Sequence, residues 1–500
     1  MKFSFAVVIT VVIAVVAATS VAADETLAPI NLAATSSKTP IVDNATGLIS
    51  YIVDLAPHLQ DGFPPTVTGE DLQRFNSRHS PQAINMVKWY EGQYGFQHTD
   101  MTSWVGNSFT AYLTQAQVDA LRTDANVVLV TENTFVDSSV TPPPWSDTMH
   151  SSSLPPYTET SSWGRNAVNG KVSSNTYRIY TIDTGVGLHE DLTNVIARVN
   201  ASCGTNNSGC PGHQTVGCYP HATHIAGIIA AAYGNKGAAG VDAGAKIFSV
   251  DVDNIDASPA ICSFPGVPTS SLASGMDYVM WDLILNGGYQ VGLVNISQNS
   301  TDFAPGGTLN AKMLTLATPY VGGYYYAGAF IAQSAGNDYL NACSYAFGYS
   351  SKQPSSSDGI MVVGAVDSQG RAVSPSNGGF TNHGWAQDQA GSNFGSCIDV
   401  WAPGKDIYST WGPMVPYDEG NSNTWQVSGH TYGDPNSNIN YVYLSGTSMS
   451  APHIVGVAAY LAETQGLATP AAIEAAVRNL FFTTGQVDKK GLLLHYVQLP

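Results

Sequence analysis

The feature that most constrains the fold is a series of short apolar runs in the second part of this 500-residue chain. Segments of helical composition separate these runs, which span residues 178–182, 245–250, 291–296, 329–332 and 360–366. Strands that are apolar throughout and alternate with helices are typical of a parallel sheet buried on both faces. We therefore predict an α/β fold over residues 166–500, a doubly wound parallel sheet flanked by helices. In such sheets the functional residues gather at the carboxyl ends of the strands.

The first third of the chain divides by composition. Residues 1–23 combine a charged start, a short apolar run and small residues, which indicates a secretory signal peptide. The alternative is a membrane anchor, but the run is shorter than the roughly 20 residues that span a bilayer. Residues 24–48 are rich in Ser, Thr, Pro and Ala and are predicted to be a linker, with order beginning near Ile49. Residues 49–138 favour a small α+β unit of the ferredoxin-like kind, and residues 139–165 read as an exposed connector.

Charge excludes several classes of partner. The 19 Lys and Arg residues against 37 Asp and Glu leave a net charge of −18, which repels nucleic acid and anionic lipid surfaces. We expect a secreted monomer, extracellular or delivered to a vacuole-like compartment. Six cysteines fit an oxidising route. Glycosylation sequons occur at Asn44, Asn200, Asn206, Asn295 and Asn299, and we expect glycans only on those in loops.

Three residues stand where reactive groups are expected. Asp183 follows the first apolar run, and His221 and Ser448 each open an apolar helical segment. Singly, they read as a turn residue, a core histidine and a helix cap. A metal pair of His221 and His224 lacks the i, i+4 spacing of zinc helices. Together the three supply the carboxylate, imidazole and hydroxyl that serine nucleophilic catalysis requires.

The sequence around these residues resembles the three signature blocks of the subtilase family. The blocks are Asp183-Thr-Gly-Val, His221-Ala-Thr-His-Ile-Ala-Gly and Gly446-Thr-Ser-Met-Ser-Ala-Pro-His, and the resemblance covers residues 145–485. It implies that Asp183 orients the base, His221 is the general base and then acid, and Ser448 is the nucleophile. The order Asp, His, Ser is that of subtilisin. One departure is Ala222, where the family has Gly.

The resemblance implies further site residues. Gln333-Ser-Ala-Gly-Asn337 is similar to the block that ends in the oxyanion asparagine, so Asn337 takes that role. Ser297, Gln298 and Asn299 lie where the family has a strand that binds the extended substrate and lines its P1 pocket. This segment departs from the family pattern Asn-x-Ser-x-Gly, because Asn299 replaces the glycine.

The α+β unit resembles the inhibitor-type propeptide of subtilases. The resemblance implies a precursor whose propeptide assists folding and then covers the active site until it is cut away, here between Glu132 and His150. The protein's own propeptide would thus be its inhibitor, and proteins or peptides its substrates. An unrelated α+β domain is the alternative.

The cysteines resemble those of secreted subtilases of the proteinase-K-like type. Six cysteines allow fifteen pairings, and the resemblance selects Cys218–Cys262 and Cys343–Cys397, with Cys203–Cys210 left over. Many relatives bind a structural Ca²⁺, but residues 233–238 offer few oxygen ligands, so no metal ligand is assigned and no cofactor is expected for the chemistry.

The sequence therefore predicts a secreted serine endopeptidase made as an autoprocessed zymogen. Two other functions stay open. A transpeptidase or ligase would let an amine intercept the acyl-enzyme, and an inactive pseudoprotease would serve as a binding protein.

Overall fold

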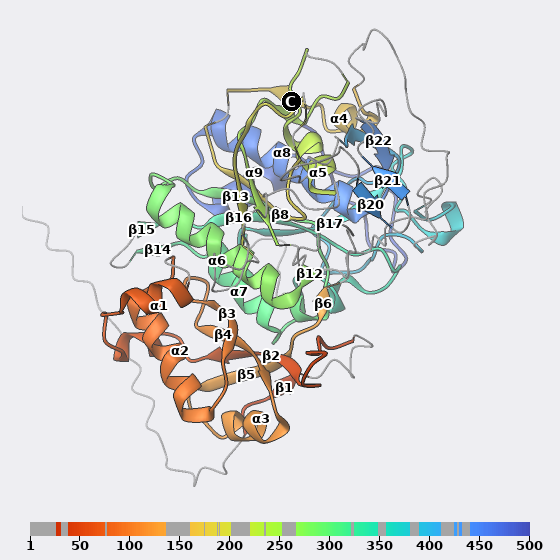
Figure 1. Ribbon diagram of the computed structural model, residues 1–500. Helices are drawn as coiled ribbons and strands as arrows, with labels where there is room; N and C mark the ends of the chain where they lie inside the picture. The colour runs from red at the N-terminus through yellow and green to blue at the C-terminus, as the bar shows by residue number, and fades with distance from the viewer. Residues whose placement is uncertain are drawn as a thin grey trace, which may run out of the picture.

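The computed structural model describes most of the chain and places it in two layered units (Figure 1). The described residues are 27–31, 39–75, 78–136, 161–174, 176–187, 189, 191–201, 221–234, 237–252, 267–321, 325–348, 357–380, 390–411, 425–427, 430–432 and 441–500. Everything said below concerns these residues.

The N-terminal unit is a five-stranded sheet with helices packed on it, which agrees with the predicted α+β character and adds strands that the sequence did not indicate. The strands run in the order β1-β5-β2-β4-β3. They are β1 (Ile30–Asn31), β2 (Ile49–Leu55), β3 (His98–Thr102), β4 (Ser108–Leu113) and β5 (Val127–Glu132). The helices are α1 (Gly69–Arg74), α2 (Pro81–Tyr94) and α3 (Gln115–Arg122). Phe109, Tyr90 and Val87 are among the side chains that fill the core between them.

Part of the expected linker 24–48 belongs to this sheet, which corrects the prediction that order begins near Ile49. Strand β1 pairs in parallel with β5, and isolated bridges join Pro40 to Thr134 and Val42 to Ile49. Because these pairings are two residues long or shorter, they leave no periodic pattern in the sequence.

The second unit is built on a parallel sheet of seven strands, which confirms the predicted α/β class. The order is β18-β17-β16-β13-β8-β11-β9. The strands are β8 (Ile179–Asp183), β9 (Val195–Asn200), β11 (Ile247–Asp251), β13 (Gly292–Ile296), β16 (Ala329–Ser334), β17 (Ile360–Val366) and β18 (Val400–Pro403). The five apolar runs became β8, β11, β13, β16 and β17. The sequence missed β9 and β18, because β9 carries polar residues and an exposed Ile196 at the sheet edge and β18 has only four residues.

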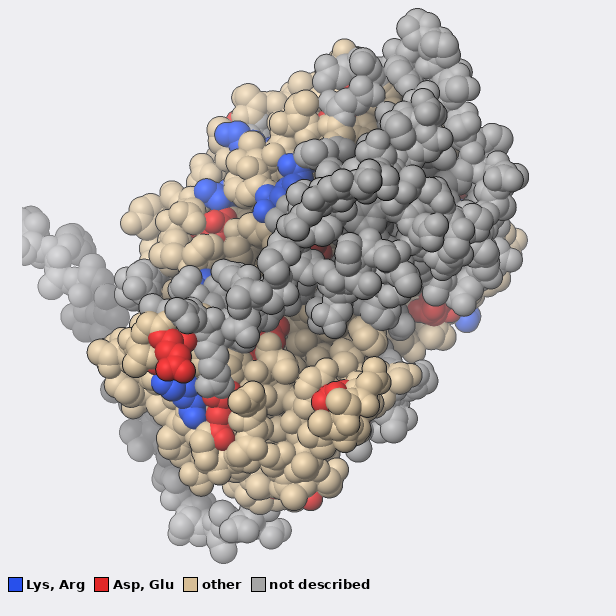
Figure 2. Space-filling model, viewed as in Figure 1, with Lys and Arg blue, Asp and Glu red and all other residues tan. Residues whose placement is uncertain are grey.

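Helices cover both faces of this sheet. One core cluster contains residues of α5 (His221–Ala230), α8 (Thr447–Gln465) and α9 (Pro470–Arg478). The opposite cluster contains residues of α6 (Thr269–Asn286) and α7 (Thr308–Ala317). No described helix is long and apolar enough to cross a membrane. On the face in Figure 2, small groups of charged side chains are separated by wide uncharged areas, which fits a chain with 11% charged residues.

The remaining elements are short. They are α4 (Trp163–Ala167), β6 (Phe135–Val136), β7 (Lys171–Val172), β10 (Asp242–Ala243), β12 (Val267–Pro268), β14 (Tyr320–Val321), β15 (Tyr325–Tyr326), β19 (Ile407–Thr410), β20 (Trp425–Val427), β21 (His430–Tyr432), β22 (Tyr441–Leu444), β23 (Phe481–Phe482) and β24 (Tyr496–Val497). Turns of 3₁₀ helix occur at Leu59–Gly62, Thr301–Phe303, Ala342–Ser344 and Pro375–Asn377.

The order of the strands determines where a site can form. From β8 the chain proceeds to β9 and β11 on one side and then returns to β13 on the other. The connections therefore diverge beyond the carboxyl ends of β8 and β13, and a crevice at such a switch point is where open α/β sheets bind ligands. Asp183 closes β8, and Ser297 follows β13 directly.

The N-terminal unit packs against α6 and α7 through buried polar contacts (Figure 1). One Asp277 carboxylate oxygen accepts from the main-chain N–H groups of Ser103, Trp104 and Val105 at 2.9, 2.6 and 3.1 Å. Ser274 donates to Asp100 at 2.6 Å. The two units are therefore joined by specific hydrogen bonds as well as by apolar contact.

Candidate active site

Asp183 and His221 form a buried pair at the carboxyl end of the sheet. His221 is the first residue of α5, and its Nδ1 lies 2.8 Å from Asp183 Oδ1. The N–H of Thr184 also donates to this oxygen, at 2.8 Å. Because both residues are at most 3% exposed, the carboxylate has few ways to turn and fixes the imidazole orientation. A carboxylate bonded to Nδ1 leaves Nε2 as the nitrogen that can take a proton.

Ser448 lies in the first turn of α8 and is held against the segment after β13. Its hydroxyl donates to the carbonyl of Ser297 at 3.2 Å, and the Ser297 hydroxyl donates to the carbonyl of Ser448 at 2.9 Å. Asn295 orients Ser297 by donating to its hydroxyl at 2.9 Å. The segment that carries Ser448 and the segment that follows β13 are thereby fixed to each other.

The contact between Ser297 and Ser448 has a cause in the sequence of α8. Because α8 begins at Thr447, Pro452 lies inside the helix rather than in its first turn, which corrects the sequence-based placement. Proline has no N–H, so the carbonyl of Ser448, four residues earlier, receives no helical hydrogen bond. The Ser297 hydroxyl supplies the missing donor.

Asn337 is oriented by Thr447, the residue that precedes Ser448 in α8. It follows β16, and its Oδ1 accepts from the N–H and the hydroxyl of Thr447 at 2.9 and 2.8 Å. Two donors on one oxygen identify it as the carbonyl oxygen of the amide and leave Nδ2 as the donor. A Cβ added to Gly446 would lie 3.3 Å from Nδ2, which places this donor beside the turn that carries Ser448. An amide N–H in this position can bind an oxyanion.

A comparison with protein families agrees with this geometry. The model described as "Subtilase family" matches residues 175–493. The chain belongs to the subtilase family. This is a family of serine-type endopeptidases.

Curated relatives of this subtilase include named proteases from fungi. It is 27% identical to an "Alkaline proteinase" of Hapsidospora chrysogena over 67% of this chain and 66% of the relative. It is 29% identical to a "Cuticle-degrading protease" of Metarhizium anisopliae (62% and 63%) and 28% identical to "Proteinase R" of Parengyodontium album (78% and 78%). The chain thus spans about two thirds of the length of the first two. A solved structure of "a cold adapted subtilisin-like serine proteinase" aligns at 23% identity and a TM-score of 0.42, over 67% of this chain and 97% of the other.

The three residues expected to bind substrate all turn their side chains into the protein. Ser297 bonds to Ser448 as described, and Gln298 Nε2 lies 3.4 Å from Asp183 Oδ2. Asn299 bonds to Ser334. All three are at most 5% exposed and their polar atoms bond within the protein, so the hydrogen bonds that this segment can offer an extended substrate come from its main chain.

The helix that carries His221 is anchored from behind. Ala222 is helical and fully buried, and its N–H donates to the Thr184 hydroxyl at 3.2 Å, so the fold accommodates the methyl that replaces the family's glycine. His224 Nε2 lies 3.1 Å from the carbonyl of Ile407, and Ser409 donates to the carbonyl of His224. The second histidine of the motif therefore holds α5 against β19.

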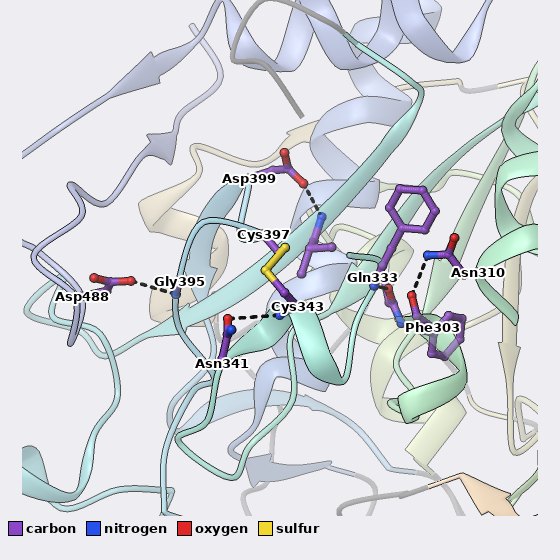
Figure 3. The surroundings of a disulfide bond; sticks show 11 residues. Phe303, Asn310, Gln333, Asn341, Cys343, Gly395, Cys397, Asp399 and Asp488 are labelled. Carbon is purple, nitrogen blue, oxygen red and sulfur yellow. Dashed lines mark hydrogen bonds between the residues drawn. A yellow bond between two sulfur atoms is a disulfide. The ribbon is translucent and has the colours of Figure 1, made fainter. Parts of the chain in front are cut away.

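The loop that carries Asn337 is braced by the side chain of Asn393 and by a disulfide, which Figure 3 shows. The expected pair Cys343 and Cys397 is bonded, with its Cα atoms 5.3 Å apart. Asn393 donates to the carbonyl of Ala335 at 2.9 Å and accepts from the N–H of Leu340 at 2.8 Å. The other expected cysteines, Cys203, Cys210, Cys218 and Cys262, lie outside the described residues, so their pairing stays a prediction.

Sequence analysis missed several supporting residues. Thr447 and Asn393 act through contacts with segments more than fifty residues away, and Asn295 acts through Ser297, whose hydroxyl bonds to Ser448 151 residues away. Two sequon asparagines are also buried in the fold, Asn295 and Asn299, which are at most 5% exposed. Among the described residues no group of three or more His, Cys, Asp or Glu side chains is arranged to hold a metal ion.

Proposed function

We propose that this subtilase is a secreted endopeptidase that hydrolyses peptide bonds through an acyl-enzyme on Ser448. The observation that carries the proposal is the Asp183–His221 pair at 2.8 Å at the same sheet edge as Ser448 and an Asn337 oriented by Thr447. These groups supply a base, a nucleophile and an oxyanion donor, which is the complete set for acyl transfer.

The reaction follows from these positions. His221 Nε2 removes the proton of Ser448 as Oγ attacks the substrate carbonyl carbon. The resulting oxyanion accepts hydrogen bonds from Asn337 Nδ2 and from the N–H of Ser448, which lies in the first turn of α8 where no helical acceptor exists. His221 then returns its proton to the leaving amine, and water releases the acyl group by the same steps in reverse.

A chemical probe tests this proposal directly. We expect a fluorophosphonate to label the processed protein at Ser448, because the activated hydroxyl displaces fluoride from phosphorus as it attacks a carbonyl. Peptide mapping locates the label, and a peptide library with and without an added amine separates hydrolysis from transpeptidation. A processed protein that neither takes the label nor cleaves any peptide would contradict the enzyme reading and favour a binding pseudoprotease.

The N-terminal unit supports a zymogen. Beyond β5 the chain forms β6, which pairs antiparallel with β12 immediately before α6. An added strand of this kind imitates an extended peptide substrate. We propose that residues 49–138 are an inhibitory propeptide and that the protein cuts itself between Glu132 and His150. Residues 137–150, which contain most of this interval, lie outside the described residues.

The contact between propeptide and peptidase should depend on pH through Asp100. Burial raises the pKa of Asp100 to about 6 and also raises that of Asp277, while burial lowers the pKa of His79 well below its usual value. The neutral form of Asp100 is favoured in the assembled state. Protonated Asp100 therefore stabilises the assembled state fully when the pH is below its ordinary pKa of 3.8. This stabilisation is lost as the pH rises through its raised pKa of about 6.

The substitution Asp100→Asn isolates the effect of the Asp100 charge, because an asparagine side chain is neutral at every pH. It is made in a precursor inactivated by Ser448→Ala. The variant should be more stable than its parent at pH 8 by up to about 3 kcal/mol, the value of a shift of about two pKa units, and equal to it at pH 4. Denaturant unfolding from pH 4 to 8 measures the difference in the free energy of unfolding between the variant and its parent. Because both proteins contain His79, its opposite contribution cancels in this difference. Asp119→Asn, on the exposed side of α3, is the control. A difference that does not change with pH would refute the assignment.

A further inference from the structure

The side chain of Asn299 bridges two segments beside the nucleophile. Its Nδ2 donates to the carbonyl of Ser334 at 2.7 Å, and its Oδ1 accepts from the Ser334 hydroxyl at 3.0 Å. Asn299 follows β13 and Ser334 ends β16, and these strands are neighbours in the sheet. The amide therefore crosses from one segment to the other just beyond the carboxyl ends of both strands.

These two segments flank the expected position of the P1 side chain, which is the substrate side chain next to the scissile bond. The carbonyl of Ser297 accepts from Ser448 Oγ, so the segment 297–299 lies beside the nucleophile. The segment that begins at Ser334 ends in the oxyanion donor Asn337. A substrate carbon attacked by Oγ, with its oxygen at Asn337, has its α-carbon one bond away. The side chain on that α-carbon, the P1 side chain, is thus directed between the two segments.

Little room is left between them. A Cβ added to Gly336, whose φ is +100°, would lie 2.2 Å from Asn393 Nδ2 and 3.6 Å from Asn299 Cγ. The side chains of Asn393 and Asn299 therefore both lie in the direction that a side chain on Gly336 would take, and they leave no space for one there. Both polar atoms of the Asn299 amide are bonded to Ser334, which is fully buried, and displacing the amide would break two buried hydrogen bonds. A glycine at 299 would leave this space open.

We propose that Asn299 determines specificity by restricting the P1 residue to small side chains such as those of Gly, Ala and Ser. The inference rests on the proposed peptidase function and names its substrate class. Ala fits beside the amide, whereas Leu or Phe collides with a side chain that cannot move without losing its partners.

The test is a set of peptides that differ only at P1, carrying Gly, Ala, Val, Leu or Phe. We expect kcat/KM of the processed enzyme to be at least about 200-fold higher for Ala than for Phe, since steric exclusion of a whole ring exceeds the 10- to 200-fold effect of one methylene. Asn299→Gly should raise the ratio of Phe to Ala by at least about tenfold, and Asn299→Ala should raise it less. The matched control is Asn310→Ala on α7, which removes a similar amide-to-carbonyl hydrogen bond, 2.7 Å from Phe303, outside the site (Figure 3).

Each outcome is decisive. A native enzyme that prefers Leu or Phe overturns the inference while leaving the peptidase function intact, whether or not the variants fold. A preference for Ala that neither substitution relaxes shows that another residue sets it and also overturns the inference. Loss of selectivity in Asn310→Ala would assign the effect to general loosening. Failure to cleave any of the peptides, together with no fluorophosphonate labelling, removes the function on which the inference rests.

Discussion

Replacing Ser448 by Ala should stop both self-processing and hydrolysis. The variant loses the hydroxyl that forms the acyl-enzyme, and we expect kcat to fall by at least about 10⁴-fold, since binding and the oxyanion donors alone give only residual catalysis. The precursor should keep the residues before about 150, which mass spectrometry of the secreted protein detects. Hydrolysis of a P1-Ala peptide measures the loss.

Ser450→Ala is the matched control for this experiment. Ser450 lies two residues further along α8, is as buried as Ser448, and is placed in none of the site's contacts. We expect this variant to be processed and active. Normal processing and turnover in Ser448→Ala would exclude Ser448 as the nucleophile.

Replacing Asn337 by Leu should lower kcat by about 10² to 10³-fold and leave KM nearly unchanged. This is the range measured for loss of the corresponding donor in subtilisin, and it applies because the Nδ2 donor of Asn337 is expected to bind the charge that develops in the transition state. Steady-state kinetics on the same P1-Ala peptide separate kcat from KM.

The control for this variant lies in the same loop. Asn341 accepts from the N–H of Cys343 at 3.3 Å and helps shape the turn, but it bonds to none of the catalytic residues (Figure 3). Asn341→Leu should keep kcat within a few fold of the native value. A loss in Asn337→Leu that appears only in KM would instead assign the residue to ground-state binding.

Much of the fold could be predicted because its signals are local. A buried parallel strand is apolar along its whole length, so the runs that became β8, β13 and β17 stand out in the sequence. The edge strand β9 could not be recognised in this way, because its exposed face carries polar residues and its pattern resembles a loop. The short strand β1 exists only because β5 pairs with it.

The candidate site could also be predicted only where its signals are local. Asp183, His221 and Ser448 were assigned from motifs and from their places at the ends of strands and helices, and the structure brings Asp183 and His221 into contact. The directions of Gln298 and Asn299 could not be read, because a strand's alternation says which face a side chain lies on but names no partner across the sheet. Their partners, Asp183 and Ser334, lie 115 and 35 residues away.

By itself the sequence determined the class of fold and predicted the candidate catalytic residues with their order along the chain, since hydrophobic periodicity and short motifs are properties of neighbouring residues. Only the tertiary structure decided how these residues are held. Ser297 reaches across 151 residues to replace the hydrogen bond that Pro452 cannot make, and Thr447 turns the amide of Asn337 across 110. The tertiary structure also set Asn299 against Ser334, which joins the segments that follow β13 and β16. Such contacts depend on how elements pack in three dimensions, which no local pattern records.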